Sequence, residues 1–234
     1  MQETLIEVNN LSSWYDENKH VIENASFSIS KNEILAFVGV NGAGKTTLIN
    51  TLTSIHSGYS LDSFAFNGAK ANFTDEKFKL SRIAVFSQDE SFRYWSFDEN
   101  IRFMYKTYNI VPDAEYMNYL IEGFNFRQYT SYMKKDLSLG NKKKYALIAA
   151  FCLRLPLLIL DEPVDGLDFE ATAFLYKVIK EYKSYGSVLM STHVVESINE
   201  SCDSYVVLKG GKLLPKETIR AKMSVPAFLH AVKG

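Results

Sequence analysis

A glycine-rich segment between an apolar run and a helix-forming run constrains the fold of this chain more than any other feature. Residues 39–46, GVNGAGKT, fit the pattern G-x-x-x-x-G-K-[ST] without a gap. The apolar run 34–38 before them predicts a buried strand, and residues 47–52 after them predict a helix. A chance glycine-rich turn is the alternative, but such a turn does not require this strand and helix around it. The segment therefore predicts an α/β architecture.

The residue types in this loop suit the binding of phosphate groups. Glycines let backbone N–H groups turn toward an anion, and the N-terminus of the following helix carries partial positive charge. Lys45 can reach β- and γ-phosphates, and the Thr46 hydroxyl can ligate Mg²⁺. We therefore expect a nucleoside-triphosphate site, with nucleotide-binding residues Asn41, Gly42, Gly44, Lys45, Thr46 and Thr47.

The composition excludes several classes of protein. Of the 234 residues, 47% are apolar and 23% charged, which excludes disordered and collagen-like chains. The net charge of −1 gives no reason to expect nucleic acid as a partner. Cys152 and Cys202 lack metal-ligand spacing, and we expect both to be buried apolar side chains. The apolar stretches are shorter than the roughly 20 residues of a membrane span, so we expect a cytoplasmic chain.

Strand and helix patterns alternate along the chain. Strands are expected at residues 4–8, 26–30, 64–66, 83–86, 157–160, 187–191 and 204–208. Helices are expected at residues 97–108, 113–123, 125–133, 138–153, 169–184 and 194–202. We predict one P-loop NTPase domain over residues 1–234, with a mostly parallel sheet, an antiparallel β subdomain on the N-terminal side and a helical subdomain inserted at about 90–135.

The helical insertion is unusually rich in aromatic side chains. These side chains either fill the core of the insertion or form a surface for a partner. Because so small a lobe cannot bury all of them, we expect a docking patch at the start of the insertion, formed by Phe92, Tyr94, Trp95 and Phe97.

Two acidic residues follow the apolar run 157–160, where α/β sheets bind ligands. Asp161 is suited to hold Mg²⁺ through water, and Glu162 to orient and polarise an attacking water molecule. Consecutive strand residues point in opposite directions, so the two should not share one role. A simple strand-ending turn is the alternative interpretation of the sequence Asp-Glu-Pro.

The segment Leu137-Ser138-Leu139-Gly140-Asn141 opens a predicted helix shortly before this strand. It resembles the LSGGQ signature of the ATP-binding cassette (ABC) family, and the other elements of that family follow the same order along the chain. The resemblance implies that Tyr15 stacks on adenine and that Gln88 senses Mg²⁺ and the γ-phosphate. It also implies that Asp168 belongs to the loop that crosses between subunits and that His193 is the switch histidine.

The resemblance covers residues 4 to about 212 and implies the ATPase subunit of an efflux-type ABC transporter. In this family two subunits pair head to tail, and each ATP lies between the phosphate loop of one subunit and the signature of the other. Glu162 is then the catalytic base, and His193 steadies the γ-phosphate. The implied ligands of Mg²⁺ are Thr46, Gln88 and Asp161, and the implied contacts from the second subunit are Ser138 and Gly140.

The implied partners are a second ABC ATPase subunit, identical or related, and a transmembrane permease docked on residues 88–105. We therefore expect a cytoplasmic protein at the inner face of the cell membrane that drives export of peptides or lipophilic compounds. A soluble ABC ATPase of an assembly or regulatory complex, such as iron–sulfur assembly, is the alternative. A cassette that binds ATP without turnover is a third, against which the presence of Glu162 and His193 argues.

Some residues depart from the family pattern or have competing interpretations. Leu139 and Asn141 replace the third and fifth signature residues, and we expect activity to survive because efflux-type relatives tolerate leucine there. Trp14 competes with Tyr15 for adenine, and Asp168 is also expected to cap the helix that follows it. The lysine run 142–144 is expected on a solvated helix face.

Overall fold

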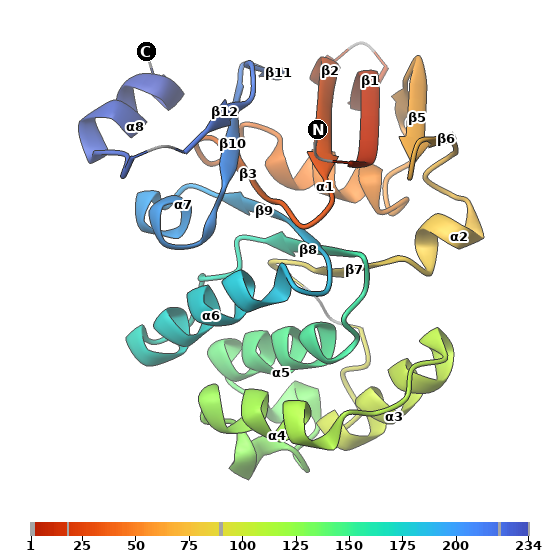
Figure 1. Cartoon of the computed structure of the whole chain (residues 1–234), viewed down its shortest axis with the longest axis vertical. Helices are drawn as coiled ribbons and strands as arrows, with labels where there is room; N and C mark the ends of the chain where they lie inside the picture. Colours follow the sequence, from red (N-terminus) through yellow and green to blue (C-terminus); the bar gives the residue numbers. More distant parts are fainter. Residues whose placement is uncertain (1–2, 18, 89–90, 220, 234) are drawn as a thin grey trace.

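One sheet lies toward the upper end of the molecule in Figure 1, a helical region lies at the lower end, and a second sheet extends from beside the first toward the helices. The computed structural model describes residues 3–17, 19–88, 91–219 and 221–233. The first sheet is antiparallel, with strand order β2-β1-β5-β6 and with β4 paired to β1. Its strands are β1 (Thr4–Asp16), β2 (Lys19–Ser30), β4 (Tyr59–Ser60), β5 (Ser63–Phe66) and β6 (Ala69–Lys70).

The second sheet is mostly parallel. Its strand order is β11-β10-β3-β9-β8-β7, with β12 paired to β10, and neighbours from β10 to β7 are parallel. Its strands are β3 (Ile34–Val38), β7 (Arg82–Val85), β8 (Leu157–Asp161), β9 (Ser187–Thr192), β10 (Ser204–Lys209), β11 (Lys212–Leu213) and β12 (Glu217–Thr218). The predicted fold class is confirmed, although β1 and β2 extend well beyond the expected residues 4–8 and 26–30.

Every residue of β3 and β8 is buried, as expected for strands covered on both faces. Alternate residues supply two cores, because successive side chains point to opposite faces. Ile34 and Leu158 pack with the helices, whereas Leu35 and Ile159 pack with the antiparallel sheet.

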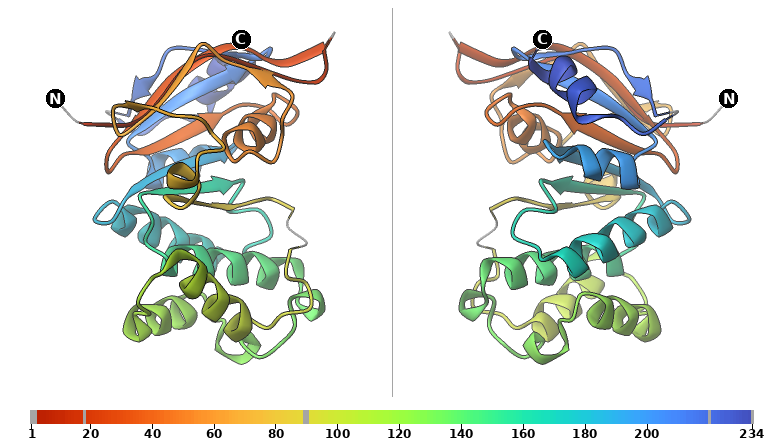
Figure 2. Two further views of the ribbon diagram at one scale, coloured as in Figure 1. Left: turned by 90° about the vertical axis from the view of Figure 1, so that its right-hand side faces the viewer. Right: turned by 90° about the vertical axis from the view of Figure 1, so that its left-hand side faces the viewer.

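Helices cover both faces of the parallel sheet, and Figure 2 shows these layers from two sides. Helix α1 packs between the two sheets, while α5 and α6 belong to the core on the opposite face. The helices of this part are α1 (Lys45–Leu52), α2 (Glu76–Lys79), α5 (Leu139–Cys152), α6 (Phe169–Tyr182), α7 (Val195–Ser201) and α8 (Val225–Lys233). No helix in the described part of the chain combines the length and apolar character needed to cross a membrane.

The helical insertion contains α3 (Phe97–Tyr108) and α4 (Ala114–Gly123). The prediction of a third helix over residues 125–133 is wrong, because only short 3₁₀ turns form at Arg127–Tyr129 and Lys134–Asp136. Asn125 has a left-handed φ of 51°, which ends the helical path before the buried Phe126.

Phe97 does not belong to the predicted docking patch, so that part of the prediction is wrong. It is the first residue of α3, is fully buried, and packs edge-on against Phe126 and Tyr145. Burial of such a ring stabilises the fold by about 1.5–3 kcal/mol. Of the two cysteines expected in the interior, Cys152 is buried and Cys202 is partly exposed.

Candidate active site

The predicted catalytic and metal-binding residues come together at the carboxyl ends of parallel strands. The phosphate loop follows β3, Gln88 lies three residues after β7, Asp161 ends β8, and His193 follows β9. The strand register aligns these ends, since Val38 lies opposite Thr192 and Asp161 lies opposite Ser191. This edge is where open α/β sheets bind ligands.

The phosphate loop has a backbone that only glycine adopts easily. Gly42 and Gly44 have φ values of 80° and 106°. A Cβ atom on Gly44 would also lie 2.8 Å from Cδ1 of Ile22. Helix α1 begins directly afterwards at Lys45, so its free N–H groups face the loop and favour an anion there.

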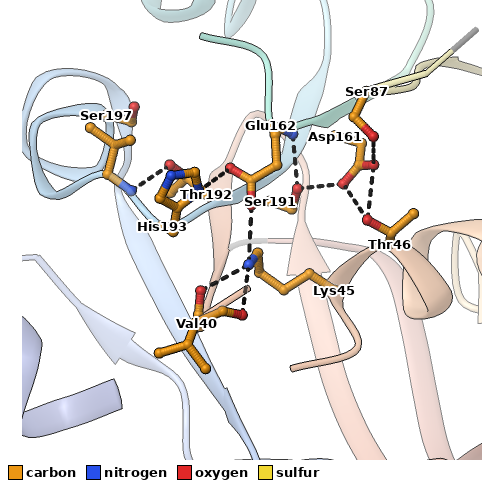
Figure 3. A network of polar contacts seen from close by, with 12 residues as sticks. Val40, Lys45, Thr46, Ser87, Asp161, Glu162, Ser191, Thr192, His193 and Ser197 are labelled. Carbon is orange, nitrogen blue, oxygen red and sulfur yellow. Dashed lines mark hydrogen bonds and ion pairs between the residues drawn. The ribbon is translucent and has the colours of Figure 1, made fainter. Parts of the chain in front are cut away.

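Lys45 is buried and its ammonium group is already engaged. Its Nζ donates hydrogen bonds to the carbonyl oxygens of Gly39 (2.8 Å) and Val40 (3.2 Å). The same atom lies 3.1 Å from Oε1 of Glu162, and Figure 3 shows this ion pair between the loop and β8. The predicted phosphate-binding lysine and the predicted catalytic base are therefore paired directly.

The carboxylate of Asp161 is fully buried and surrounded by hydroxyl groups (Figure 3). It accepts hydrogen bonds from Ser191 Oγ (2.6 Å), Ser87 Oγ (2.9 Å) and Thr46 Oγ1 (3.1 Å). Carboxylate and hydroxyl oxygens are the ligands that Mg²⁺ prefers, so these residues fit the predicted metal site. Gln88 lines a pocket of about 690 Å³ together with Thr46, Ser87 and Asp161. Residues 89 and 90, within the predicted docking region 88–105, lie outside the described residues.

Glu162 takes an unusual backbone conformation and points to different partners from Asp161. Its φ is 45°, a left-handed value that is uncommon for a residue with a side chain. Its backbone N–H donates to Ser191 Oγ at 2.9 Å. Its Oε2 lies 2.9 Å from Nδ1 of His193, opposite the contact to Lys45. The carboxylate is thus held between the phosphate loop and the turn after β9.

Tyr15 is the second-last residue of β1 and is 66% exposed. Its ring centroid is 4.5 Å from that of His56, whereas Trp14 stacks on His20 at 4.8 Å. Most of Tyr15 is therefore exposed, as stacking on a base requires.

The signature segment lies against the loop that follows β8. Ser138 caps α5, with Oγ accepting from the Asn141 N–H at 3.3 Å. A Cβ atom on Gly140 would lie 2.5 Å from the carbonyl oxygen of Gly166, so only glycine permits this approach. In the described part of the chain, no hydrogen bond or ion pair joins Ser138 or Gly140 to the phosphate loop.

Asp168 caps α6 as predicted, accepting from the Ala171 N–H at 2.8 Å. Its other carboxylate oxygen accepts from Lys144 Nζ at 2.8 Å, and this hydrogen bond holds the pKa of Asp168 below its ordinary value. The expected solvated face for the lysine run is wrong for Lys143 and Lys144, which are both buried. Lys143 donates to the carbonyl oxygen of Glu162, and Lys144 donates to the carboxylate of Asp168.

Comparison with known proteins settles the family. A family model described as ABC transporter matches residues 22–165, more than half of the chain. The chain belongs to the ABC transporter family.

Its relatives agree over nearly the whole length. The putative ABC transporter ATP-binding protein AlbC of Bacillus subtilis is 31% identical over 211 residues, which cover 88% of each chain. The SkfA peptide export ATP-binding protein SkfE of the same organism is 30% identical over 215 residues, covering 90% of this chain and 87% of SkfE. A solved structure of an ATP binding subunit of an ABC transporter superposes with a TM-score of 0.82 at 29% identity, covering 92% of this chain and 90% of that one.

ABC ATP-binding proteins bind and hydrolyse ATP, so this chain is an ABC ATPase. The predictions of family, fold class and ATPase activity are confirmed. Sequence reasoning missed Ser87, Ser191 and Lys143, which contact Asp161 or Glu162 directly. The signal for the two serines was available, because each is a polar residue at or just beyond the end of a strand in the parallel sheet.

Proposed function

We propose that this ABC ATPase hydrolyses Mg²⁺-ATP between two subunits and drives a separate membrane permease, in export of peptides or lipophilic compounds. The observation that carries the proposal is the convergence of a phosphate loop, a hydroxyl-lined carboxylate and the Glu162–His193 pair at one sheet edge. The domain boundaries belong to the same proposal, with one ATPase domain over residues 1–234 and a helical subdomain at about 90–135.

The geometry supports a division of roles. Lys45 and the loop N–H groups would bind the β- and γ-phosphates, with Asn41, Gly42, Gly44 and Thr47 forming the rest of the cradle. Thr46, Gln88 and Asp161 would hold Mg²⁺, which when bound neutralises charge that develops on the phosphates. Glu162 would accept a proton from the attacking water, and His193, 2.9 Å from Glu162, would orient that carboxylate and contact the γ-phosphate.

The separation of the two halves of the site supports a head-to-tail pair. Ser138 caps its own α5 and Gly140 packs closely against the Gly166 loop, and among the described residues neither is hydrogen-bonded to the phosphate loop. The N-terminus of α5 is nevertheless suited to bind an anion, because its first N–H groups lack helical acceptors. We therefore assign Ser138 and Gly140 to the ATP of a second subunit. Asp168, on the adjoining loop, would lie at the same interface.

An exposed aromatic cluster supports a docking face for the permease. Phe92, Trp95 and Phe103 contact one another, with centroid distances of 5.0–5.6 Å. Phe92 and Phe103 are 40% and 43% exposed, and the neighbouring Tyr94 is 62% exposed. Aromatic patches of this kind are enriched at protein interfaces. The aromatic cluster lies within the 88–105 region, where we place the permease and hence the inner face of the membrane.

Export of peptides is supported by the resemblance to SkfE, which is 30% identical and named for peptide export. A tagged copy should be expressed in its native host and extracted from membranes in mild detergent. A multi-span protein that co-purifies in stoichiometric amount supports the proposal and identifies the chain that selects the substrate. Soluble partners alone would favour the alternative of an assembly complex.

The docking face has its own test in the purified complex. Replacing Phe92, Trp95 and Phe103 with serine should leave the basal turnover of the isolated subunit unchanged and abolish stimulation by the permease. Val111→Ser is a suitable control, because Val111 is 88% exposed between α3 and α4. Loss of the folded state in the triple variant would show instead that the aromatic cluster fills the core of the insertion.

A further inference from the structure

A buried lysine outside the predicted catalytic set lies beneath the turn that carries Glu162. Lys143, on the second turn of α5, is only 5% exposed. Its Nζ donates to the carbonyl oxygens of Glu162 (3.2 Å), Asp161 (3.4 Å) and Phe86 (3.5 Å). One ammonium group thus contacts three peptide carbonyls from the ends of two neighbouring strands.

Placing a lysine here is costly unless its charge does something that an apolar side chain cannot. Removing an ammonium group from water is unfavourable, and only good acceptors offset the cost. A methionine would fill similar space without that penalty. The ammonium group has three N–H donors and can hold several carbonyl groups at once, which an apolar side chain of similar length cannot do.

The main chain of Glu162 has a conformation that such contacts can stabilise. Its left-handed φ of 45° persists only where the surroundings enforce it. The Glu162 N–H is bound by Ser191 Oγ at 2.9 Å, and its carbonyl oxygen is bound by Lys143 at 3.2 Å. The carbonyl oxygen also accepts from the Asp165 N–H at 3.3 Å within the turn, so side chains of β9 and α5 add to a local turn hydrogen bond. The carboxylate, 2.9 Å from His193 and 3.1 Å from Lys45, takes its direction from this turn.

We infer that Lys143 is a positioning residue, which holds the Glu162 turn in the conformation that aims its carboxylate at the phosphate site. The inference rests on the proposed role of Glu162 as catalytic base. Lys143 also joins the helix that begins at the signature to the end of β7, two residues before Gln88. Because Ser138 caps α5 and Lys143 lies on it, α5 connects the signature with the glutamine segment and the catalytic turn.

The test compares Lys143→Met with Lys143→Arg in the full-length chain, using steady-state ATP hydrolysis. We expect Lys143→Met to lower kcat by about 10- to 100-fold, because small misplacements of a catalytic group have effects of this size. KM for ATP should stay within about twofold, since the phosphate contacts are untouched. Lys143→Arg should restore most of kcat. Lys180→Met is the matched control, because it removes a lysine charge from the exposed face of α6.

A double-mutant cycle separates positioning from a general structural effect. If Lys143 acts through Glu162, adding Lys143→Met to Glu162→Gln should lower the residual rate by less than about twofold. An equal loss in both backgrounds, an unchanged kcat, or a parallel rise in KM would overturn the inference. If Lys143→Met does not fold, Lys143→Gln, which keeps N–H donors, takes its place in the cycle. A Glu162→Gln enzyme with normal turnover would instead overturn the proposed catalytic base.

Discussion

Lys45 of the phosphate loop and Glu162 at the end of β8 form an ion pair, with Nζ 3.1 Å from Oε1. Both side chains are largely shielded from water, at 6% and 12% exposure. A nucleotide phosphate would need the same ammonium group, so binding exchanges one anionic partner of Lys45 for another. The pair therefore opposes nucleotide binding until a phosphate replaces the carboxylate.

Removing the charge of Glu162 should accordingly strengthen nucleotide binding. We expect Glu162→Gln to bind ADP about three- to tenfold more tightly than the parent, because a charged hydrogen bond to Lys45 no longer competes. Titration calorimetry with ADP measures this without ATP-driven pairing of subunits. Glu196→Gln, an exposed position on α7, should leave the affinity unchanged. Equal ADP affinity in parent and Glu162→Gln would show that the ion pair does not compete.

His193 should matter for turnover rather than for folding. Its Nδ1 lies 2.9 Å from Glu162 Oε2, and the ring is only partly buried. We expect His193→Ala to lower kcat by about 100-fold, the lower end of the range for groups that act on proton transfer. Phosphate release under saturating ATP measures the effect, with His230→Ala on α8 as control. Turnover equal to that of the parent would remove His193 from the mechanism.

The Lys144–Asp168 contact makes a pH-dependent contribution to stability. Lys144 lowers the folded-state pKa of Asp168, so the contribution is present above the unfolded pKa of about 3.9 and is lost as pH falls through the folded pKa. Because Asp168 is exposed, we expect Lys144→Met to cost only about 0.5–1 kcal/mol through this pair at pH 7. Denaturant unfolding should show a smaller difference in unfolding free energy between parent and variant at pH 3 than at pH 7. A difference independent of pH would indicate lost packing alone.

The approach of Gly140 to Gly166 predicts a cost for the smallest added side chain. A Cβ at residue 140 would lie 2.5 Å from the Gly166 carbonyl oxygen, so Gly140→Ala must displace the signature or the loop. We expect a loss of about 1–3 kcal/mol in unfolding free energy, as for other overpacked sites. ATP-driven pairing should weaken as well, which light scattering measures. Unchanged stability and pairing would mean that the two segments are not tightly packed.

Local signals account for what could be predicted from the sequence. Helix α3 begins and ends at the predicted residues, because Ser96 and Glu99 form a capping box and Asn109 ends the helix with a φ of 53°. The phosphate loop and Asp161 were found because each follows a continuous apolar strand. Such features depend on neighbours in the chain and are visible without the structure.

What could not be predicted depends on contacts between distant segments. Lys143 looks like part of a solvated charge run, and its contacts to carbonyl groups at the ends of β7 and β8 depend on how distant segments pack. Phe97 looks like its aromatic neighbours until α3 directs it against Tyr145 of α5. The left-handed φ of Glu162 has no signal in the sequence, because glycine or asparagine is the usual residue there.

One variant tests both proposals, that two subunits enclose ATP and that Glu162 drives its hydrolysis. Glu162→Gln should be measured by size-exclusion chromatography with light scattering, with and without Mg²⁺-ATP, beside a phosphate-release assay. We expect a stable dimer only with ATP, and turnover lowered by roughly 10²- to 10³-fold, as for removal of a major transition-state contribution. A variant that stays monomeric with ATP and hydrolyses it at the parent rate would show that Glu162 has neither role.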